Sequence, residues 1–446
     1  MSVQDDVSNN LVAPHTLVVD PPTNHQFQEK TVSKMSAVRP IHNAVRSVTS
    51  SAAASASARP LSGIFGINKP SGPTSMSLLD DLKPLFATSP LFADADGNRV
   101  NDKSRKRGKF GAKGKAKWAG GVAGAPKIGQ GGTLDPLADG VLVIGVGNGT
   151  KHLQKYLDCT KEYRSTGLLG SATTSYDSCD PILTRKPFDH VTPQMIAHLL
   201  PRFTGAVLQI PPLYSAVRMD GKRLFEYARE NLPLPRPIEA RRVTIHELRL
   251  VDWLEPGKHA FKEPQREVPP EDKALVGRVL HMAGRKEGQT DTVKEVDATA
   301  PQEPEESAST ITTSWQKSPT TADANSSATE NSESQADPAG PPAFVLEMTV
   351  SSGTYVRSIV HDLALAAGSA AHVQTLTRTR QGEWSINTPS SDDKPSINGN
   401  CIDWSVFADA IAEMKREATD AQFKSARDAE GLRAWERQLL KVIVPV

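Results

Sequence analysis

Gly129-Gln-Gly-Gly-Thr-Leu-Asp-Pro-Leu-Ala-Asp-Gly140 is the most informative stretch of this 446-residue chain, and the apolar run Val141-Leu-Val-Ile144 follows it directly. Its four glycines can adopt positive φ and let the backbone approach a ligand closely, so the stretch predicts a sharp loop. The apolar run suits a buried strand. Asp135 is therefore expected on a constrained, partly buried loop, where an ionised carboxylate can act as a nucleophile. From the residues alone, an Asx-turn carboxylate that satisfies loop amides is the favoured alternative.

The sequence lacks the patterns of several other kinds of site. The glycine-rich loop carries no GxxxxGK[ST] pattern, so it is not a phosphate-binding loop of that kind. The three cysteines, Cys159, Cys179 and Cys401, exclude a disulfide framework, and their spacing fits no zinc site. We therefore expect no metal and a reducing, intracellular compartment. No apolar run reaches the roughly 18 residues of a membrane span, and no secretory signal is recognisable.

The composition predicts a folded core diluted by disordered segments. Hydrophobic residues make up 38% of the chain, below the roughly 45–50% of a compact globular protein, and 33 prolines accompany 31 glycines. Lys and Arg number 52 against 51 Asp and Glu, but these charges are unevenly distributed. Residues 101–118 hold eight basic residues and one acidic residue, whereas residues 298–342 hold seven acidic residues and one lysine.

Low-complexity segments divide the chain. Residues 1–62 are expected to be disordered; between Met35 and residue 62 they contain arginines but no acidic residue, as in a mitochondrial transit peptide. Initiation at Met35 would then give a mitochondrial form, and an inert tail is the alternative. The basic insert 94–118 is either a solvated loop or an arm that contacts phosphates. Residues 257–342 are expected to form a disordered, acidic insert.

Periodicity and capping signals predict an α+β fold. Helices are expected from Thr74 or Ser75 through Leu82, from the N-cap Thr192 with Pro193 at the first position, at 222–231, at 356–367 and within 405–437. Strands are expected at 63–68, 141–144, 161–172, 241–253 and 343–350.

Four blocks stand in order along the chain, and three of them flank the glycine-rich loop. They are Gly63-Ile-Phe-Gly-Ile-Asn-Lys-Pro-Ser-Gly-Pro-Thr-Ser75; the loop itself; Gln209-Ile-Pro-Pro-Leu-Tyr-Ser-Ala216 with Asp220-Gly-Lys-Arg223 and Tyr227-Ala-Arg229; and Ser352-Gly-Thr-Tyr-Val-Arg357 with Asp362-Leu363 and Leu376 to Arg378. Together the blocks resemble the TruB-type tRNA pseudouridine-55 synthase family, in its eukaryotic branch, and they cover roughly half of the chain.

The resemblance implies a pseudouridine synthase fold: a mixed, mostly antiparallel sheet with flanking helices and a central RNA-binding cleft. The catalytic domain would comprise residues 63–256 and 343–386. Residues 387–446 would form a C-terminal helical tail without the small RNA-binding barrel (PUA-like module) of the bacterial relatives. A guide RNA is not expected, and a monomer is the default.

The implied reaction is a cofactor-free isomerisation of uridine to pseudouridine in the T-loop of tRNA, after the base is flipped out. Asp135 matches the nucleophile, and Arg357 matches the arginine that pairs with it, because a guanidinium favours and orients a carboxylate. Tyr163 matches the tyrosine that stacks on the target base. Taken singly, Arg357 could be an ordinary helix-start arginine and Tyr163 a core tyrosine.

Further residues are implied to bind the substrate. Leu376 matches an apolar wall residue, for which a plain core role is the alternative, and Lys69 is expected to shape the loop beneath the site. Gln130 stands where the family usually has a histidine that inserts near the extruded nucleotide. A second departure is Thr173-Thr174-Ser175 in place of Thr-Asp-Thr, although Asp177 is kept.

Substrate and location leave alternatives open. Besides the T-arm of tRNA, mRNA hairpins that imitate a T-loop are candidate substrates, so mRNA pseudouridylation is a second hypothesis. A non-catalytic RNA-binding or RNA-folding protein is the rival from another class. No membrane partner is expected, and the nucleus, the cytoplasm or both are the expected compartments, besides the mitochondrial form.

Overall fold

The computed structural model describes residues 59–94, 97, 122–230, 232–270, 273, 290–294, 340–387 and 398–446. Our expectations for residues 1–58, with the Met35 start, lie outside this part of the chain. The same holds for the basic residues 101–118 and for most of the acidic insert.

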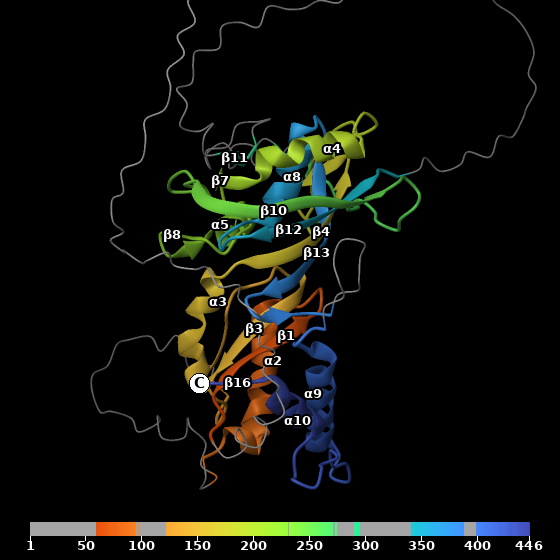
Figure 1. Cartoon of the computed structure of the whole chain (residues 1–446). Coiled ribbons are helices and arrows are strands. Elements are labelled where there is room, and N and C mark those ends of the chain that lie inside the picture. The colour runs from red at the N-terminus through yellow and green to blue at the C-terminus, as the bar shows by residue number, and fades with distance from the viewer. Residues whose placement is uncertain are drawn as a thin grey trace, which may run out of the picture. The chain divides into compact units, whose positions relative to one another are not determined.

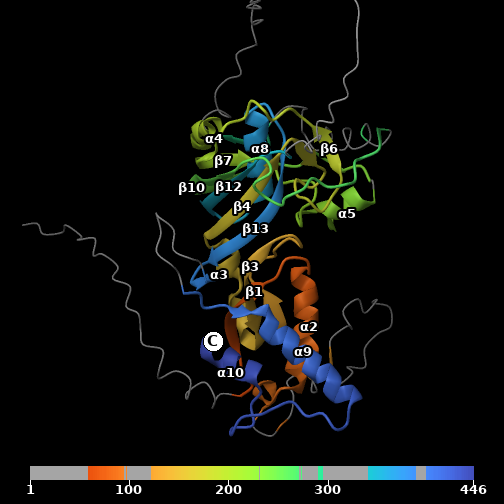
Figure 2. The same cartoon turned by 90° about the vertical axis from the view of Figure 1, so that its right-hand side faces the viewer.

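A large mixed sheet organises the described residues (Figures 1 and 2). Its strand order is β11 (Thr292–Lys294), β7 (Gly205–Gln209), β10 (Arg241–Leu254), β12 (Ala343–Val350), β4 (Lys161–Leu169), β13 (Ala371–Gln381), β3 (Asp139–Val146), β1 (Gly63–Lys69) and β15 (Ile402–Asp403). Three further strands pair at its sides, namely β2 (Ile128–Gln130), β14 (Trp384–Ser385) and β16 (Val444–Pro445). Only the β1–β15 and β13–β3 pairs among them are parallel, so the expected α+β class with a mostly antiparallel sheet is confirmed.

Smaller elements complete the described chain. Two hairpins are β5 (Ser171–Thr173) with β6 (Ile182–Arg185) and β8 (Arg218–Met219) with β9 (Lys222–Arg223). The helices are α2 (Ser75–Thr88), α3 (Gln154–Asp158), α4 (Pro193–Leu199), α5 (Leu224–Arg229), α8 (Val356–Ala366), α9 (Trp404–Thr419) and α10 (Ala434–Val442), with 3₁₀ turns η2 (Pro90–Phe92), η4 (Gly147–His152) and η5 (Leu200–Phe203).

The helix boundaries follow the sequence signals. Thr74 Oγ1 accepts a hydrogen bond from the Ser77 amide at the start of α2, and Thr192 Oγ1 accepts one from the Met195 amide at the start of α4. Gly368, at φ +78°, ends α8 in the left-handed region. These expected helices are confirmed, and α8 packs against β4 and β13 on one face of the sheet.

The parallel contact between β13 and β3 places two distant segments side by side. Thr377 and Arg378 of β13 pair with Asp139 and Gly140 at the start of β3. On its other side β13 pairs with β4, and Arg378 lies opposite Tyr163. The glycine-rich loop, which runs directly into β3, therefore lies beside the strands that carry Leu376 and Tyr163.

The C-terminal segment packs into the domain rather than forming a helical tail. Our expectation of helix within 405–437 is met by α9 and the start of α10, but 420–433 is not helical, and Gly431 there has φ +76°. Phe407 of α9 and Trp435 of α10 lie among Phe65 and Phe86, with ring centroids 5.5–6.4 Å apart. Burial of these rings, together with the pairing of β15 and β16 with β1, ties residues 402–445 to the start of the domain.

Part of the expected disordered insert is ordered, which corrects our reading of residues 257–342. Within 257–270, the amide of Val268 bonds the Ile182 carbonyl, and Glu263 and Glu267 pair with Arg185. Residues 292–294 form β11 on the edge of the sheet. The polar composition of these residues predicted disorder. Their order depends on partners in distant segments of the chain, which the local sequence does not reveal. None of the described helices is long and apolar enough to cross a membrane.

Candidate active site

The loop that carries Asp135 connects β2 to β3 and is held by buried polar side chains. Ser75, at the start of α2, accepts a hydrogen bond from the Leu134 amide (2.9 Å), and its hydroxyl contacts the Leu134 carbonyl (3.0 Å). Lys69 Nζ donates to the carbonyls of Pro136 (3.4 Å) and Ala138 (2.6 Å) on the other side of Asp135. The backbone is thus fixed on both sides of the carboxylate, so the loop presents Asp135 in one position.

Strand β13 clamps the glycine part of the same loop. Arg378 Nη2 donates to the Gly132 carbonyl (3.2 Å), and Gln381 Nε2 donates to the Gly131 carbonyl (2.6 Å). Gly132 has φ +130°, which a residue with a Cβ rarely adopts, and a Cβ on Gly140 would lie 2.3 Å from the Arg378 carbonyl oxygen. Glycine is therefore needed both for the turn and for the close approach of the two strands.

Arg357, in the first turn of α8, lies at the centre of a polar network. Its Nε lies 3.0 Å from Asp135 Oδ2. Its Nη1 donates to Asp177 Oδ2 (3.2 Å) and to the Ser175 carbonyl (2.8 Å), and its Nη2 donates to the Tyr214 carbonyl (2.9 Å). Each nitrogen of the guanidinium thus has a partner, which fixes the plane of the group and with it the position of Asp135.

Exposure divides this network into a buried support and an open functional end. The Arg357 side chain is 5% exposed and that of Asp177 is 8% exposed, whereas the Asp135 side chain is 40% exposed. Burial opposes the charged form of Arg357, but Asp135 and Asp177 outweigh it and raise its pKa further above the ordinary value. Burial also raises the pKa of Asp177, against the opposing charge of Arg357. Of these three charged side chains, only Asp135 is open to a ligand, and the permanently charged Arg357 lies beside it.

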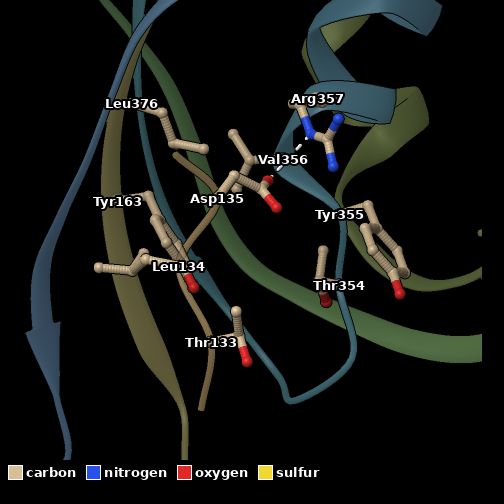
Figure 3. A pocket seen from close by; sticks show the side chains of 9 residues that line it. All are labelled: Thr133, Leu134, Asp135, Tyr163, Thr354, Tyr355, Val356, Arg357 and Leu376. Atoms are coloured by element: carbon tan, nitrogen blue, oxygen red, sulfur yellow. Dashed lines mark ion pairs between the residues drawn. The ribbon is translucent and has the colours of Figure 1, made fainter. Parts of the chain in front are cut away.

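The carboxylate of Asp135 projects into a cavity of about 100 Å³ (Figure 3). Figure 3 shows Tyr163 and Leu376 on one side of Asp135 and Arg357 and Tyr355 on the other. The cavity is lined by Thr133, Leu134, Asp135, Tyr163, Thr354, Tyr355, Val356, Arg357 and Leu376. A small cavity that combines a charged pair, several hydroxyls and apolar side chains suits a flat, polar-edged ring such as a nucleobase.

The structure brings together four of the residues that the sequence singled out. Asp135, Arg357, Tyr163 and Leu376 come from a loop, a helix and two adjacent strands, and all four line the cavity. Tyr163 is half-buried and packs on the main hydrophobic core, and Leu376 is 6% exposed. Tyr163 and Leu376 therefore both contact the hydrophobic core and also line the cavity, so a core position and a position in the site are compatible for each of them.

Lys69 and Gln130 lie outside the cavity lining. Lys69 is fully buried beneath the loop, and burial lowers its pKa to about 8, although the charges of Asp139 and Asp135 oppose that shift. Its amine contacts backbone carbonyls of the loop and of Pro70, so it shapes the loop rather than reaching a ligand. Gln130 Nε2 donates to the hydroxyl of Thr133, a lining residue (3.0 Å), so it touches the cavity only through Thr133.

Two residues of the site were named from the sequence but given no role. Tyr355 lines the cavity, and burial raises its pKa. Asp177 holds the far side of Arg357. The signal for Tyr355 was its position two residues before Arg357. Asp177 could not have been paired with Arg357 from the sequence, because 180 residues separate them.

Among the described residues, no group of three or more His, Cys, Asp or Glu side chains could hold a metal ion. The three cysteines there are free.

Comparison with known proteins yields a consistent set of relatives. A family model described as TruB family pseudouridylate synthase (N terminal domain) matches residues 121–263. The chain is 37% identical over 369 residues to tRNA pseudouridine synthase 4 of Schizosaccharomyces pombe, an alignment that covers 78% of this chain and 82% of that protein. It is 33% identical over 341 residues to the Saccharomyces cerevisiae protein of the same name, covering 73% and 78%. Human pseudouridylate synthase TRUB1 is 38% identical over 196 residues, covering 44% of this chain and 50% of that protein.

Proposed function

The chain belongs to the TruB family of pseudouridylate synthases, and on that premise we propose that it converts uridine to pseudouridine in the T-loop of tRNA, at position 55, with Asp135 as the nucleophile. The two yeast relatives are named as tRNA pseudouridine synthases, which supports the reaction and the substrate class. The observation that carries the assignment of roles is the ion pair between Asp135 and Arg357 in a cavity lined by Tyr163 and Leu376.

The proposed reaction needs a carboxylate, a cation and walls that retain free uracil. Asp135 attacks either the ribose C1′ or the uracil ring, and the bond between C1′ and N1 breaks. The uracil then rotates, C5 bonds to C1′, and the bond between Asp135 and the nucleotide breaks, which regenerates the carboxylate. C5 loses a proton and N1 gains one, so the composition of the nucleotide is unchanged. No cofactor takes part. Arg357 keeps Asp135 ionised and oriented before the attack and stabilises the carboxylate again on release.

The aromatic and apolar walls would hold the base during rotation. We assign to Tyr163 stacking on the flipped uracil and proton transfer at C5, for which a phenol offers a ring face and a hydroxyl in one side chain. Leu376 and Val356 line the cavity with apolar surface, which confines the ring without fixing its orientation. Such a slot allows the base to rotate while it keeps C5 near C1′.

Binding elsewhere must offset the cost of flipping the base, which is about a few kcal/mol. We propose that the basic residues 101–117 supply part of it by contacting phosphates of the T-arm, with release of counterions. The proposal requires no guide RNA, and one copy of the chain supplies every residue assigned above.

The test is incubation of the purified full chain with an unmodified tRNA transcript, followed by mapping of pseudouridine. We expect product at the T-loop uridine from the wild type and none from Asp135→Asn. Asp158→Asn is the matched control, because its carboxylate lies on α3, where it contacts Gln154. The nucleophile assignment is refuted if Asp135→Asn forms product at the rate of the control.

The same assay separates the other candidate functions. A non-catalytic RNA-folding protein would leave the tRNA unmodified while promoting its folding, and Asp135→Asn would promote it equally well. Activity on isolated hairpins with a T-loop sequence, at a rate similar to that on whole tRNA, would extend the proposal to mRNA hairpins.

We propose in addition that initiation at Met35 yields a mitochondrial form, beside a nuclear or cytoplasmic full-length product. The support is the basic, acid-free composition of residues 36–62. Import assays on products of the two start sites test it, and absence of import of the Met35 product would end it.

A further inference from the structure

Two buried polar residues stand at the start of β11, within the segment that separates β10 from β12 along the chain. Asp291 is 5% exposed and Thr292 is 2% exposed. β11 is an edge strand of three residues, and it pairs with β7 through Thr292 opposite Gln209 (Figure 1). Burying polar side chains is costly unless they form hydrogen bonds, so the partners of these two residues indicate what the strand does.

The Thr292 contact leads to the cavity through one residue. Gln209 Nε2 donates to Thr292 Oγ1 (3.1 Å) and to the Tyr355 carbonyl (3.2 Å), while Gln209 Oε1 accepts from the Tyr355 amide (2.8 Å). The hydroxyl of Thr292 therefore fixes the amide plane of Gln209, and Gln209 in turn holds the backbone of Tyr355. Tyr355 lines the cavity and immediately precedes α8, the helix that carries Arg357.

The Asp291 contacts lead to the other side of Arg357. Asp291 Oδ2 accepts a hydrogen bond from the Tyr176 hydroxyl (3.2 Å), and the Asp291 amide donates to Asp362 Oδ1 (2.9 Å) in α8. The ring of Tyr176 stacks on His361 with centroids 3.9 Å apart. Tyr176 is thus held by Asp291 and by α8 together.

Tyr176 is a conformationally strained residue between two partners of Arg357. Its φ is +66°, which is unfavourable for a bulky side chain and persists only where surrounding contacts enforce it. The residues on either side, Ser175 and Asp177, supply the carbonyl and the carboxylate that bind Arg357 Nη1. Because its partners hold the Tyr176 side chain, the turn at 175–177 keeps its shape and its hydrogen bonds to Arg357.

We propose that Asp291 and Thr292 are positioning residues for the Asp135–Arg357 pair, acting through Tyr176 and through Gln209 with Tyr355. The activity readout of this inference rests on the proposed function, whereas the placement of Arg357 can be tested without it. Residues at the start of β11 would thus support the site from a distance, because neither Asp291 nor Thr292 lines the cavity.

The first test measures single-turnover pseudouridine formation and RNA affinity with the full chain and an unmodified tRNA transcript. Asp291→Asn and Thr292→Val should each slow the single-turnover rate roughly tenfold, with RNA affinity within about twofold of wild type, because a small misplacement of a reacting group is costly. Thr292→Ser keeps the hydroxyl and should restore the rate. Thr204→Val is the matched control, since it removes a hydrogen bond to the Leu200 carbonyl that leads to no cavity residue.

A double-mutant cycle tests the route. Tyr176→Phe removes the hydroxyl that Asp291 binds but keeps the stacked ring, so its effect and that of Asp291→Asn should overlap, and the double variant should be no slower than the slower single variant. Tyr176→Phe also replaces Asp291→Asn if that variant does not fold. Additive effects of the two changes would overturn the route through Tyr176.

A second readout does not depend on activity. Hydrogen exchange of the Arg357 Nε proton, followed by ¹⁵N NMR in the free protein, should be at least about fivefold faster in Asp291→Asn and Thr292→Val than in wild type and Thr204→Val, because a guanidinium that is held less firmly beside Asp135 exposes this proton to water more often. Unchanged exchange, or changes no larger than those in Thr204→Val, would overturn the proposal. If the wild type formed no pseudouridine, the proposed function would fail, and the exchange data would still decide the positioning role.

Discussion

Replacing Arg357 by lysine tests whether the shape of the guanidinium, rather than its charge, orients Asp135. The three guanidinium nitrogens reach four acceptors: Asp135, Asp177 and the carbonyls of Ser175 and Tyr214. A lysine has its three donors on one nitrogen and cannot occupy these separated positions. Asp177 is the most buried carboxylate of the set, so the ammonium should stay with it and leave Asp135 without its partner.

The size of the effect follows from burial. Two buried carbonyls lose donors in Arg357→Lys, at about 1–3 kcal/mol each, and water from the open cavity recovers part of this, so the free energy of unfolding should fall by roughly 2–4 kcal/mol. The loss of orientation at Asp135 should slow single-turnover pseudouridine formation about 100-fold or more. Urea denaturation and pseudouridine mapping after rapid quench measure the two quantities.

Arg433→Lys is the matched control. Arg433 is also buried and binds Thr88 Oγ1 (3.1 Å) and Glu417 Oε2 (3.2 Å), far along the chain from the cavity residues. It should lose stability by a similar amount and keep its rate. A rate for Arg357→Lys within about threefold of wild type would refute the claim that the fork geometry positions Asp135.

Three further predictions concern the loop support, the core and the RNA contacts. Burial lowers the pKa of Lys69 from its ordinary value of 10.5 to about 8, so between these pH values the unfolded chain binds a proton that the folded protein does not. The unfolding free energy of the wild type, relative to that of Lys69→Met, should therefore rise as the pH increases from about 8 to 10.5, by at most roughly 3 kcal/mol. This gain should be lost as the pH falls back to 8. Urea denaturation at pH 7 and pH 10 measures this difference, and equal values at both pH values would contradict a lowered pKa of the buried Lys69 amine. Phe407→Ala should lower the unfolding free energy by about 3–5 kcal/mol, because it removes a fully buried ring, and should leave the single-turnover rate unchanged at a temperature where the variant is folded. Deleting residues 101–117 should weaken tRNA binding and flatten the dependence of affinity on salt, as titrations at several salt concentrations would show, with the rate at saturating protein preserved; an unchanged salt slope would count against the phosphate contacts.

The sequence predicted best those elements whose signal is local. The strand expected at 343–350 has the observed bounds, and Thr192 caps α4 as expected, because alternation and capping are encoded within a few residues. Strand β13 was not anticipated as an element, since it is rich in His, Gln, Thr and Arg. Its polar side chains are buried because Arg378 and Gln381 bind carbonyls of a loop more than 200 residues away, which no local pattern reveals.

The site shows the same division. The blocks identified Asp135, Arg357 and Leu376, the family resemblance added Tyr163, and the structure places all four around one cavity. Lys69 was expected to bind substrate, but it ends a buried strand and turns inward, a direction that sequence position alone does not give. The support from β11 was hidden because its neighbours in sequence are polar and of low complexity, whereas its partners come from β7, α8 and the 173–177 turn.

The pairing of β1 has a consequence for how this chain is made. β1 is hydrogen-bonded to β3 on one side, while its other edge is covered by β15 and β16, whose residues are synthesised more than 300 positions later. During translation that edge stays bare, and bare strand edges invite pairing with other chains. The part of the sheet formed by β1, β15 and β16 should therefore assemble last, after the strands that surround Tyr163, and a nascent chain halted before residue 400 should depend on chaperones to stay soluble.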